Sequence, residues 1–301
     1  MTQLLVWQVG PVRVRAEVPL AAPLATWVRR LYPDARSDAG SGFRARARSE
    51  ALESGPVMPD ETILLESGTD GFHVSRGDRI AGPLSPEDAF VAFELELSRA
   101  LLEHQPTLPL HGGGAAGSSG AVLLSGPGES GKSTLTASLA LAGYPVFGDD
   151  VILVDGSSGY IQPFPRLLKL TEPARSSLGI PEKDRWARRF PLVDATLIHP
   201  RGLGSGWSPP APLTAVIFPH RDPDWQENPR WEPVPPSRAM ALLMAQRIFP
   251  VRDPGRDFQI LADVVGAAST VEVHYREAAQ LVGRLEEWLG TPIPPTEAPG
   301  S

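Results

Sequence analysis

Apolar and charged residues alternate near the start of the chain. Over residues 11–18 the apolar side chains occupy every second position, which is the period of a strand with one buried face: Val12, Val14, Ala16 and Val18. Residues 4–9 supply a second apolar run on the other side of Gly10-Pro11, and this arrangement predicts an antiparallel hairpin. The chain is therefore expected to open as β-structure.

A helix is predicted further along, before residue 105. Ser85 is placed to cap it, Pro86 suits its first turn, and Asp88 occupies the position of a capping box. The apolar positions that follow recur every three or four residues from Phe90 to Leu101, as on one face of a helix. Residues 1–104 are therefore predicted to form a β-rich domain that ends in this helix.

The pattern changes after a glycine-rich turn region. Residues 121–124 are continuously apolar, as in a buried parallel strand, and residues 133–142 form a leucine- and alanine-rich helix that Gly143 ends. A strand is expected at 145–147, so the order is strand, loop, helix, strand. Further elements are a hairpin over 151–161, a strand at 213–218, a strand at 271–274, and helices at 237–248 and 275–289. We predict an α/β domain over 105–290 and a disordered tail over 291–301.

Composition narrows the classes of function. A length of 301 residues allows two modest domains, and a hydrophobic fraction of 42% suits an ordinary folded protein. The formal charge of -7 argues against broad neutralisation of nucleic-acid phosphates, and the lack of cysteine excludes disulfides and thiolate chemistry. Because no stretch approaches the ~20 apolar residues of a membrane span and the start lacks a basic n-region, we expect a cytoplasmic protein without membrane or nucleic-acid partners.

The segment Gly126-Pro-Gly-Glu-Ser-Gly-Lys-Ser133 fits the Walker A pattern between a predicted strand and a predicted helix. Its glycines let backbone amides surround a phosphate, Lys132 can reach the β- and γ-phosphates, and the Ser133 hydroxyl can ligate Mg²⁺. ATP and Mg²⁺ are therefore the expected ligands. The residues expected to bind the nucleotide are Gly126, Gly128, Glu129, Ser130, Gly131, Lys132, Ser133 and Thr134.

Two acidic residues and a histidine are candidates for catalysis beside Lys132. Asp149 and Asp150 follow the strand after the Walker A helix, where carboxylates can face the γ-phosphate and the metal. One carboxylate could hold the ion, with Ser133 and Asp150 as the expected ligands, while the other takes the proton of an attacking hydroxyl. Which aspartate is the base stays open. His111 ends a probable strand before the glycine-rich turn and can reach the same place.

These residues together resemble the catalytic core of the HPr serine kinase/phosphorylase family. The resemblance covers about forty residues: Leu110-His111-Gly112, the Walker A segment, Gly143, and Gly148-Asp149-Asp150. It implies a P-loop kinase core of the HPr kinase C-terminal type with a smaller β-rich N-terminal domain. It also implies that Asp149, Asp150 and His111 surround the γ-phosphate and that one carboxylate serves as acid/base for a serine hydroxyl.

The resemblance is greatest to the HPr-kinase-like branch, some members of which modify small peptides. A peptide or small protein is therefore the expected substrate. The segment Arg201-Gly-Leu-Gly204 is similar to a short stretch of the HPr enzymes, but it lies further from the aspartates and His199 stands where they have a glutamate. The resemblance therefore implies neither a second metal-linked carboxylate nor the phosphorylase back-reaction.

The sequence favours an ATP-dependent serine kinase and leaves two alternatives open. A nucleotide-binding switch or peptide-binding protein would bind ATP with little turnover, against which the acidic pair and His111 argue. A small-molecule P-loop kinase fits the same motifs. Arg166 and Lys169 follow the hairpin and can approach the nucleotide, while the basic cluster at 183–189 is either an anion site or a solvated helix face. The oligomeric state is open, a homo-oligomer included.

Overall fold

The computed structural model describes residues 2–9, 12–19, 24–31, 36–37, 61–182, 185–248 and 253–295. The protein is mixed α/β, with seven helices among these residues and sheets that combine parallel and antiparallel pairs. It divides into two compact units. Described residues up to Gln105 belong to the first unit together with those of Glu182–Leu197, which the sequence analysis had placed in the second domain.

The first unit contains a six-stranded sheet in the order β3-β1-β2-β4-β5-β6. The predicted hairpin is confirmed, because β1 and β2 pair antiparallel with Val9 opposite Val12. The even-numbered residues of β2 that alternate with charged ones are buried, as the period-two pattern requires. The strands are β1 (Thr2–Val9), β2 (Val12–Pro19), β3 (Arg36–Ser37), β4 (Glu61–Ser67), β5 (Phe72–Arg76) and β6 (Arg79–Leu84).

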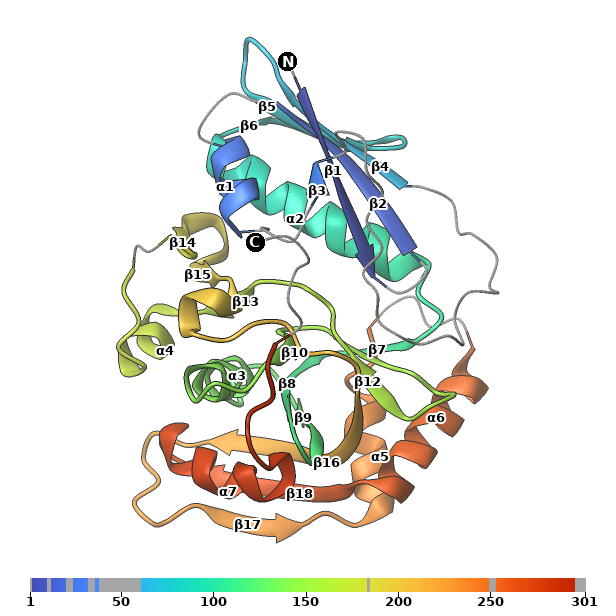
Figure 1. The fold of residues 1–301 in the computed structure, drawn as a ribbon, viewed down its shortest axis with the longest axis vertical. Helices are drawn as coiled ribbons and strands as arrows, with labels where there is room; N and C mark the ends of the chain where they lie inside the picture. The colour runs from blue at the N-terminus through green and yellow to red at the C-terminus, as the bar shows by residue number, and fades with distance from the viewer. Residues whose placement is uncertain are drawn as a thin grey trace. The chain divides into compact units, whose positions relative to one another are not determined.

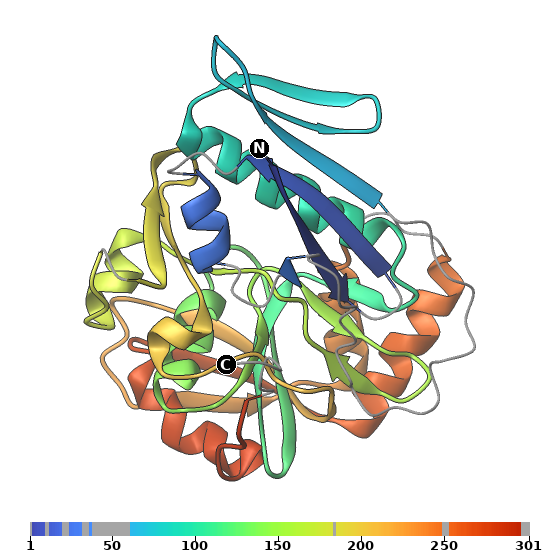
Figure 2. The same ribbon diagram turned by 45° about the horizontal axis from the view of Figure 1, so that its top comes forward.

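Helix α2 (Pro86–Glu103) lies along one face of this sheet (Figures 1 and 2). Its predicted start is confirmed: the Ser85 hydroxyl accepts a hydrogen bond from the Asp88 amide at 3.1 Å. Phe90 and Phe93 on its buried face are fully shielded from solvent. The unit also contains α1 (Leu24–Leu31), β14 (Ala187–Phe190), the 3-10 helix η1 (Pro191–Val193) and β15 (Ala195–Ile198).

The basic cluster predicted at 183–189 is not a helix face. Arg188 and Arg189 lie on strand β14, between the buried residues Ala187 and Phe190. The Arg188 guanidinium stacks 3.6 Å from the ring centre of Trp27 and pairs with Glu87, and Arg189 pairs with Asp194. Both guanidinium groups are thus paired with side chains of the first unit. Lys183 lies outside the described residues.

The second unit contains a nine-stranded sheet. Its path runs β10-β8-β9-β16-β12-β11-β7, and β18 pairs with both β16 and β17 beside that path. β9 and β18 are parallel to β16, whereas β8 is antiparallel to β9. The strands are β7 (Leu108–Leu110), β8 (Gly112–Gly117), β9 (Gly120–Ser125), β10 (Val146–Gly148), β11 (Ile152–Val154), β12 (Tyr160–Gln162), β16 (Ala211–Arg221), β17 (Arg230–Pro233) and β18 (Ser269–Tyr275).

Helices cover both faces of this sheet, which explains the continuous apolar run in β9. Ala121 and Leu123 pack in one core with residues of α5 (Pro236–Met244) and α6 (Pro254–Ala267). The alternate residues Val122 and Leu124 are equally buried and lie outside that core, on the side of α3 (Lys132–Leu141) and α7 (Ala279–Leu289). The strand before the Walker A segment and the helix after it are thus confirmed. Figure 1 shows α5 and α6 side by side.

Several elements differ from the sequence analysis. Strand β17 lies between the strand predicted at 213–218 and the helix predicted at 237–248, and neither β17 nor α6 was predicted. The helix expected at 275–289 begins only at Ala279, because Tyr275 belongs to β18. Residues 163–211, for which no element was predicted, contain β13 (Leu168–Leu170), α4 (Glu172–Ser177) and the 3-10 helix η2 (Pro200–Leu203) in addition to β14 and β15.

The C-terminal segment is partly placed. The Thr291 amide donates to the Ser118 hydroxyl at 3.0 Å, and Pro292 bridges to Gly117. The rest of the predicted disordered tail, residues 296–301, lies outside the described residues. Among the described helices, none combines the length and the apolar character that crossing a membrane requires.

Candidate functional site

Three chain segments meet at one edge of the nine-stranded sheet. β9 leads into the Walker A segment Gly126–Ser133, here called the glycine loop, and β10 leads directly into Asp149 and Asp150. β8 lies between these strands and runs antiparallel to both, so Gly112 at its start pairs with Ser125 at the end of β9. His111, immediately before β8, therefore lies at the same edge. The topology gathers the three motifs on which the sequence analysis depended.

The glycine loop closes tightly around its own lysine. The Lys132 ammonium donates to the carbonyl oxygens of Gly126 at 2.9 Å and of Pro127 at 2.6 Å. Lys132 is buried, and burial lowers the pKa of its ammonium, while the charges of Asp149 and Asp150 oppose that shift. Lys132 is the first residue of α3, so its ammonium lies near the helix N-terminus. Backbone amides and the helix dipole favour an anion at that end of a helix.

Glu129 at the tip of the loop is exposed, as are Pro127 and Gly128, whereas Ser130 is buried. Glu129 adopts a left-handed backbone with φ of 64°, and Asp150 does the same with φ of 65°. Non-glycine residues rarely adopt this conformation, and such strain concentrates at functional sites. These two residues lie at the sheet edge where the motifs converge, whereas the third such residue, Asp194 with φ of 45°, lies in the first unit.

The far side of the loop is braced by residues that the sequence analysis did not identify. The Ser130 carbonyl accepts hydrogen bonds from the Arg221 amide and from the Tyr275 hydroxyl, both at 3.3 Å. Tyr275 is fully buried, and burial raises the pKa of its phenol, which keeps the hydroxyl protonated as a donor. These residues end β16 and β18, so the parallel strands beside β9 fix the shape of the loop.

Gly131 fits this brace closely. It has φ of 95°, and a Cβ there would lie 2.1 Å from the Tyr275 hydroxyl oxygen. Gly131→Ala is therefore expected to destabilise the protein by on the order of 2 kcal/mol, through strain and overpacking. Thermal unfolding measures this effect.

Gly128→Ala is the matched control for that variant. Gly128 is exposed, and a Cβ there would meet nothing within 4 Å. We expect its free energy of unfolding to stay within about 0.5 kcal/mol of wild type. Equal destabilisation by both substitutions would show that the contact with Tyr275 does not shape the loop.

Asp149 is bonded directly to the glycine loop. Its Oδ1 accepts from the Ser133 hydroxyl at 2.9 Å, and its Oδ2 accepts from the backbone amide of Lys169 at 2.9 Å. Burial raises the pKa of the Asp149 carboxyl to about 7 and the charge of Asp150 adds to the shift, while the bonds from Lys169 and Ser133 oppose it. Near neutral pH this carboxyl is thus poised to lose or gain a proton.

The raised pKa predicts how stability depends on pH. A folded-state pKa of about 7 against an ordinary value of 3.8 means that ionising Asp149 destabilises the fold as pH rises between these values. Asp149→Asn keeps an acceptor and a donor in place without the charge. It should therefore unfold several degrees higher than wild type above pH ~7, with an advantage that shrinks toward pH ~4.

Thermal melts of the two proteins across this range test the prediction. An Asp149→Asn variant that is less stable than wild type at every pH would show that the buried carboxylate is compensated in the folded state. An advantage that grows on acidification would contradict the raised pKa itself.

Asp150 is less buried and points to other partners. Its carboxylate Oδ2 lies 3.4 Å from Arg166 Nη1, and its backbone oxygen lies 3.1 Å from His111 Nδ1. Because a carbonyl only accepts, Nδ1 carries the proton and Nε2 is left as an acceptor. Burial lowers the pKa of His111, with the charge of Lys132 acting in the same direction, so the imidazole is largely neutral at pH ~7. His111 thus holds the strained backbone of Asp150.

The remaining sequence candidates fall into two groups. Arg166 and Lys169 contact the aspartates as described, although Lys169 does so through its backbone. His199 lies elsewhere: its Nδ1 accepts from the Arg201 amide at 3.1 Å as the cap of η2, and its ring packs edge-to-face on Trp207. These contacts give His199 a structural role.

Comparison with models of protein families finds no match to this chain, and comparison with curated protein sequences finds none either. The resemblance to HPr kinases accordingly depends on the motif residues between Leu110 and Asp150.

Proposed function

We propose that the protein transfers the γ-phosphate of ATP to a hydroxyl group, that of a serine in a peptide or small protein. The observation that carries this proposal is the bond between Ser133 of the glycine loop and the buried carboxylate of Asp149, with Asp150 and His111 at the same sheet edge. A phosphate site and two carboxylates with different environments are thereby brought together. P-loop kinases need this combination.

The glycine loop supplies the groups that bind phosphate. Backbone amides of the loop and of the first turn of α3 point outward from the helix N-terminus, and the Lys132 ammonium lies among them. Lys132 bonds to backbone carbonyl oxygens, which are weaker partners than phosphate oxygens. We therefore expect the ammonium to exchange these carbonyls for the β- and γ-phosphates of ATP. A P-loop kinase core of the HPr kinase type is part of the same proposal.

The oxygen donors beside the loop fit Mg²⁺. The Ser133 hydroxyl and the Asp149 carboxylate are adjacent hard oxygen ligands, the type that Mg²⁺ prefers in proteins. When bound there, Mg²⁺ neutralises negative charge on the phosphates. Asp150 was the aspartate first expected to bind the metal. Because Ser133 bonds to Asp149, we assign Asp149 as the metal ligand instead. Asp150 is then available to contact the acceptor hydroxyl.

Asp150 then serves as the base. The acceptor oxygen forms a bond to the γ-phosphorus while the bond from that phosphorus to the bridging oxygen of ADP breaks. The acceptor proton passes to the Asp150 carboxylate, which Arg166 contacts at 3.4 Å and helps to orient. His111 fixes the backbone from which this carboxylate projects. Lys132 stabilises charge on the transferring group, so positioning and electrostatics supply the catalysis.

ADP formation from Mg-ATP tests this function against the nucleotide-switch alternative. The full chain is incubated with serine-containing peptides and with small hydroxyl compounds in turn, and ADP is measured against an acceptor-free control. ADP formation that depends on a serine peptide supports the proposal. Dependence on a small hydroxyl compound instead indicates a small-molecule kinase, and tight ATP binding without acceptor-dependent ADP indicates a switch.

A further inference from the structure

A second group of ligand-type side chains lies on β16, β17 and β18, apart from the aspartates. Glu232, Glu272 and His274 each place a donor atom within 4.8 Å of the others. His220 joins them, because its Nε2 lies 2.5 Å from Glu272 Oε1, and His274 Nε2 lies 3.9 Å from the same oxygen. The His220 and His274 rings stack with centroids 4.9 Å apart.

The sheet itself creates this cluster. In the register of the parallel pair, His220 on β16 lies opposite His274 on β18. In the antiparallel pair, Glu232 on β17 lies opposite Glu272 on β18. Glu272 and His274 are two residues apart, so they face the same side of the strand, and cross-strand partners share that face. Four ligand-type residues from three adjacent strands are thus held on one face by backbone pairing.

We propose that His220, Glu232, Glu272 and His274 bind a divalent transition-metal ion of the Zn²⁺ class. Two imidazole nitrogens and two carboxylates are a donor set that suits Zn²⁺, whereas Mg²⁺ and Ca²⁺ prefer oxygen donors alone. Ligands about 2.0–2.2 Å from a tetrahedral ion lie roughly 3.3–3.6 Å from each other. The donor atoms of Glu232, Glu272 and His274 lie within 4.8 Å of one another, and His220 contacts Glu272, so binding an ion would require these side chains to close toward that spacing.

Two arginines compete with such an ion. Arg230 Nε lies 3.2 Å from Glu232 Oε1, and the Arg230 side chain is 52% exposed. Arg238 Nη2 lies 2.7 Å from Glu272 Oε2 and 3.0 Å from Oε1. The Arg238 side chain is 55% exposed, whereas that of Glu272 is 6% exposed. The Arg238 guanidinium can therefore turn toward solvent. Alternatively, it can keep its bond to Oε2 alone and orient the Glu272 carboxylate from outside the metal site. The buried carboxylate cannot move away, so it needs a cation in either state.

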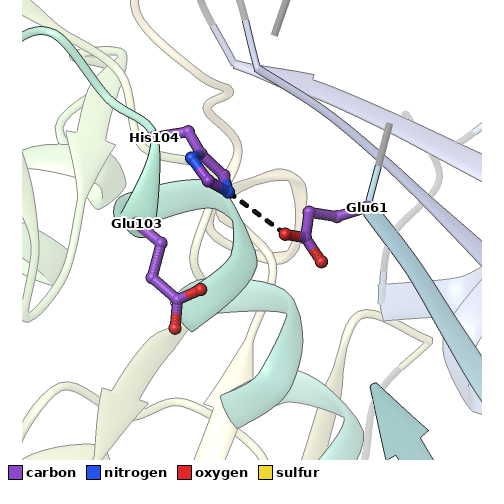
Figure 3. A group of neighbouring side chains, drawn as sticks. All are labelled: Glu61, Glu103 and His104. Carbon is purple, nitrogen blue, oxygen red and sulfur yellow. Dashed lines mark hydrogen bonds and ion pairs between the residues drawn. The ribbon is translucent and has the colours of Figure 1, made fainter. Parts of the chain in front are cut away.

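A comparable group in the first unit shows why the mobility of the arginine matters. Figure 3 shows Glu61 of β4 facing His104 at the C-terminal end of α2. Glu103 is the residue before His104 in the chain. There both oxygens of Glu103 are bound by Arg76, at 2.8 and 2.7 Å, and the Arg76 side chain is only 6% exposed. A metal ion at this place would lie beside a buried guanidinium that has no route to solvent. We therefore assign the metal to the β16–β18 cluster alone.

The proposed ion would stabilise the strand ends that brace the glycine loop. The residues directly after His220 and His274 are Arg221 and Tyr275, which bond to the Ser130 carbonyl. An ion that joins β16 to β18 would limit their separation. The proposal itself does not depend on the phosphotransferase activity.

Titration of the metal-free full chain with Zn²⁺ alone tests the site. The chain is first treated with a chelator, Zn²⁺ binding is followed by calorimetry, and Co²⁺ is used in parallel for its visible absorption bands. We expect one ion to bind at this cluster and to raise the unfolding temperature. His274→Gln and Glu272→Gln should each weaken Zn²⁺ binding by more than about tenfold, because loss of an outer partner alone has that effect.

Two matched variants control for the other carboxylate groups. His104→Gln alters the group in Figure 3, and Asp155→Asn alters a turn carboxylate that belongs to neither cluster; both should bind Zn²⁺ as wild type does. Circular dichroism establishes that each variant is folded, and His220→Gln replaces Glu272→Gln in the test if the latter unfolds. Failure of the wild-type chain to bind Zn²⁺ or Co²⁺, or equal binding by the cluster variants, would overturn the proposal.

Discussion

Asp150→Asn is expected to bind Mg-ATP almost as wild type does and to lose phosphoryl transfer by ~10²–10⁴-fold, the contribution typical of a general base. An amide has the shape of the carboxylate and can still accept a hydrogen bond from Arg166, which lies 3.4 Å away. It cannot take the acceptor proton. The backbone contact with His111 is unaffected because it involves the Asp150 carbonyl oxygen. Equilibrium ATP binding and the single-turnover transfer rate separate the two effects.

Asp155→Asn is the matched control for this variant. Asp155 begins the turn between β11 and β12 and bonds to Ser157 within that turn. Its replacement should leave the transfer rate unchanged. Unchanged transfer by Asp150→Asn would exclude Asp150 as the base, and an equal loss of ATP affinity and transfer rate would assign it to nucleotide binding instead.

Lys132→Ala is expected to weaken Mg-ATP binding by on the order of 10²–10³-fold, because the ammonium is a buried cation at the proposed phosphate site. In the folded protein the ammonium also bonds to the Gly126 and Pro127 carbonyls, so its loss could change the shape of the loop. Lys132→Met separates these effects, since methionine keeps most of the volume without the charge. The ATP dissociation constant and the unfolding temperature are measured for both variants.

The charge explanation predicts that the two substitutions weaken ATP binding equally. If Lys132→Met restored most of the affinity, packing of the lysine stem would be the cause. Full affinity in both variants would remove Lys132, and with it the Walker A interpretation, from the account.

Local patterns predicted much of the fold. Alternation over residues 11–18 identified β2, the Ser85 cap identified the start of α2, and the apolar run before Gly126 identified β9. Each of these signals lies within a few neighbouring residues, where period and capping chemistry are informative. Helix α6 carried a similar signal, Asp253 before Pro254, since the Asp253 side chain accepts from the Gly255 and Arg256 amides.

Long-range pairing could not be read in the same way. The insertion of antiparallel β8 between β9 and β10 brings His111 to the aspartates, but no local pattern specifies which strands become neighbours. Tyr275 and Ser130 are bonded although they lie 145 positions apart in the sequence. Nothing in the sequence near Tyr275 distinguishes it from other core tyrosines as a partner of the loop. The different environments of Asp149 and Asp150 likewise come from tertiary contacts with Lys169 and Arg166. The sequence motifs therefore identify the candidate residues, but not the tertiary contacts that give each of them its environment.

The most direct test of the phosphotransferase account follows the labelled phosphate itself. The full chain is incubated with γ-labelled ATP, Mg²⁺ and serine-containing peptides, and products are identified by mass for wild type, Lys132→Ala and Asp150→Asn. The account predicts one labelled phosphoryl group on a peptide hydroxyl with wild type and almost none with either variant. Label that stays on ATP although the nucleotide is tightly bound, or that transfers equally with Asp150→Asn, would contradict it.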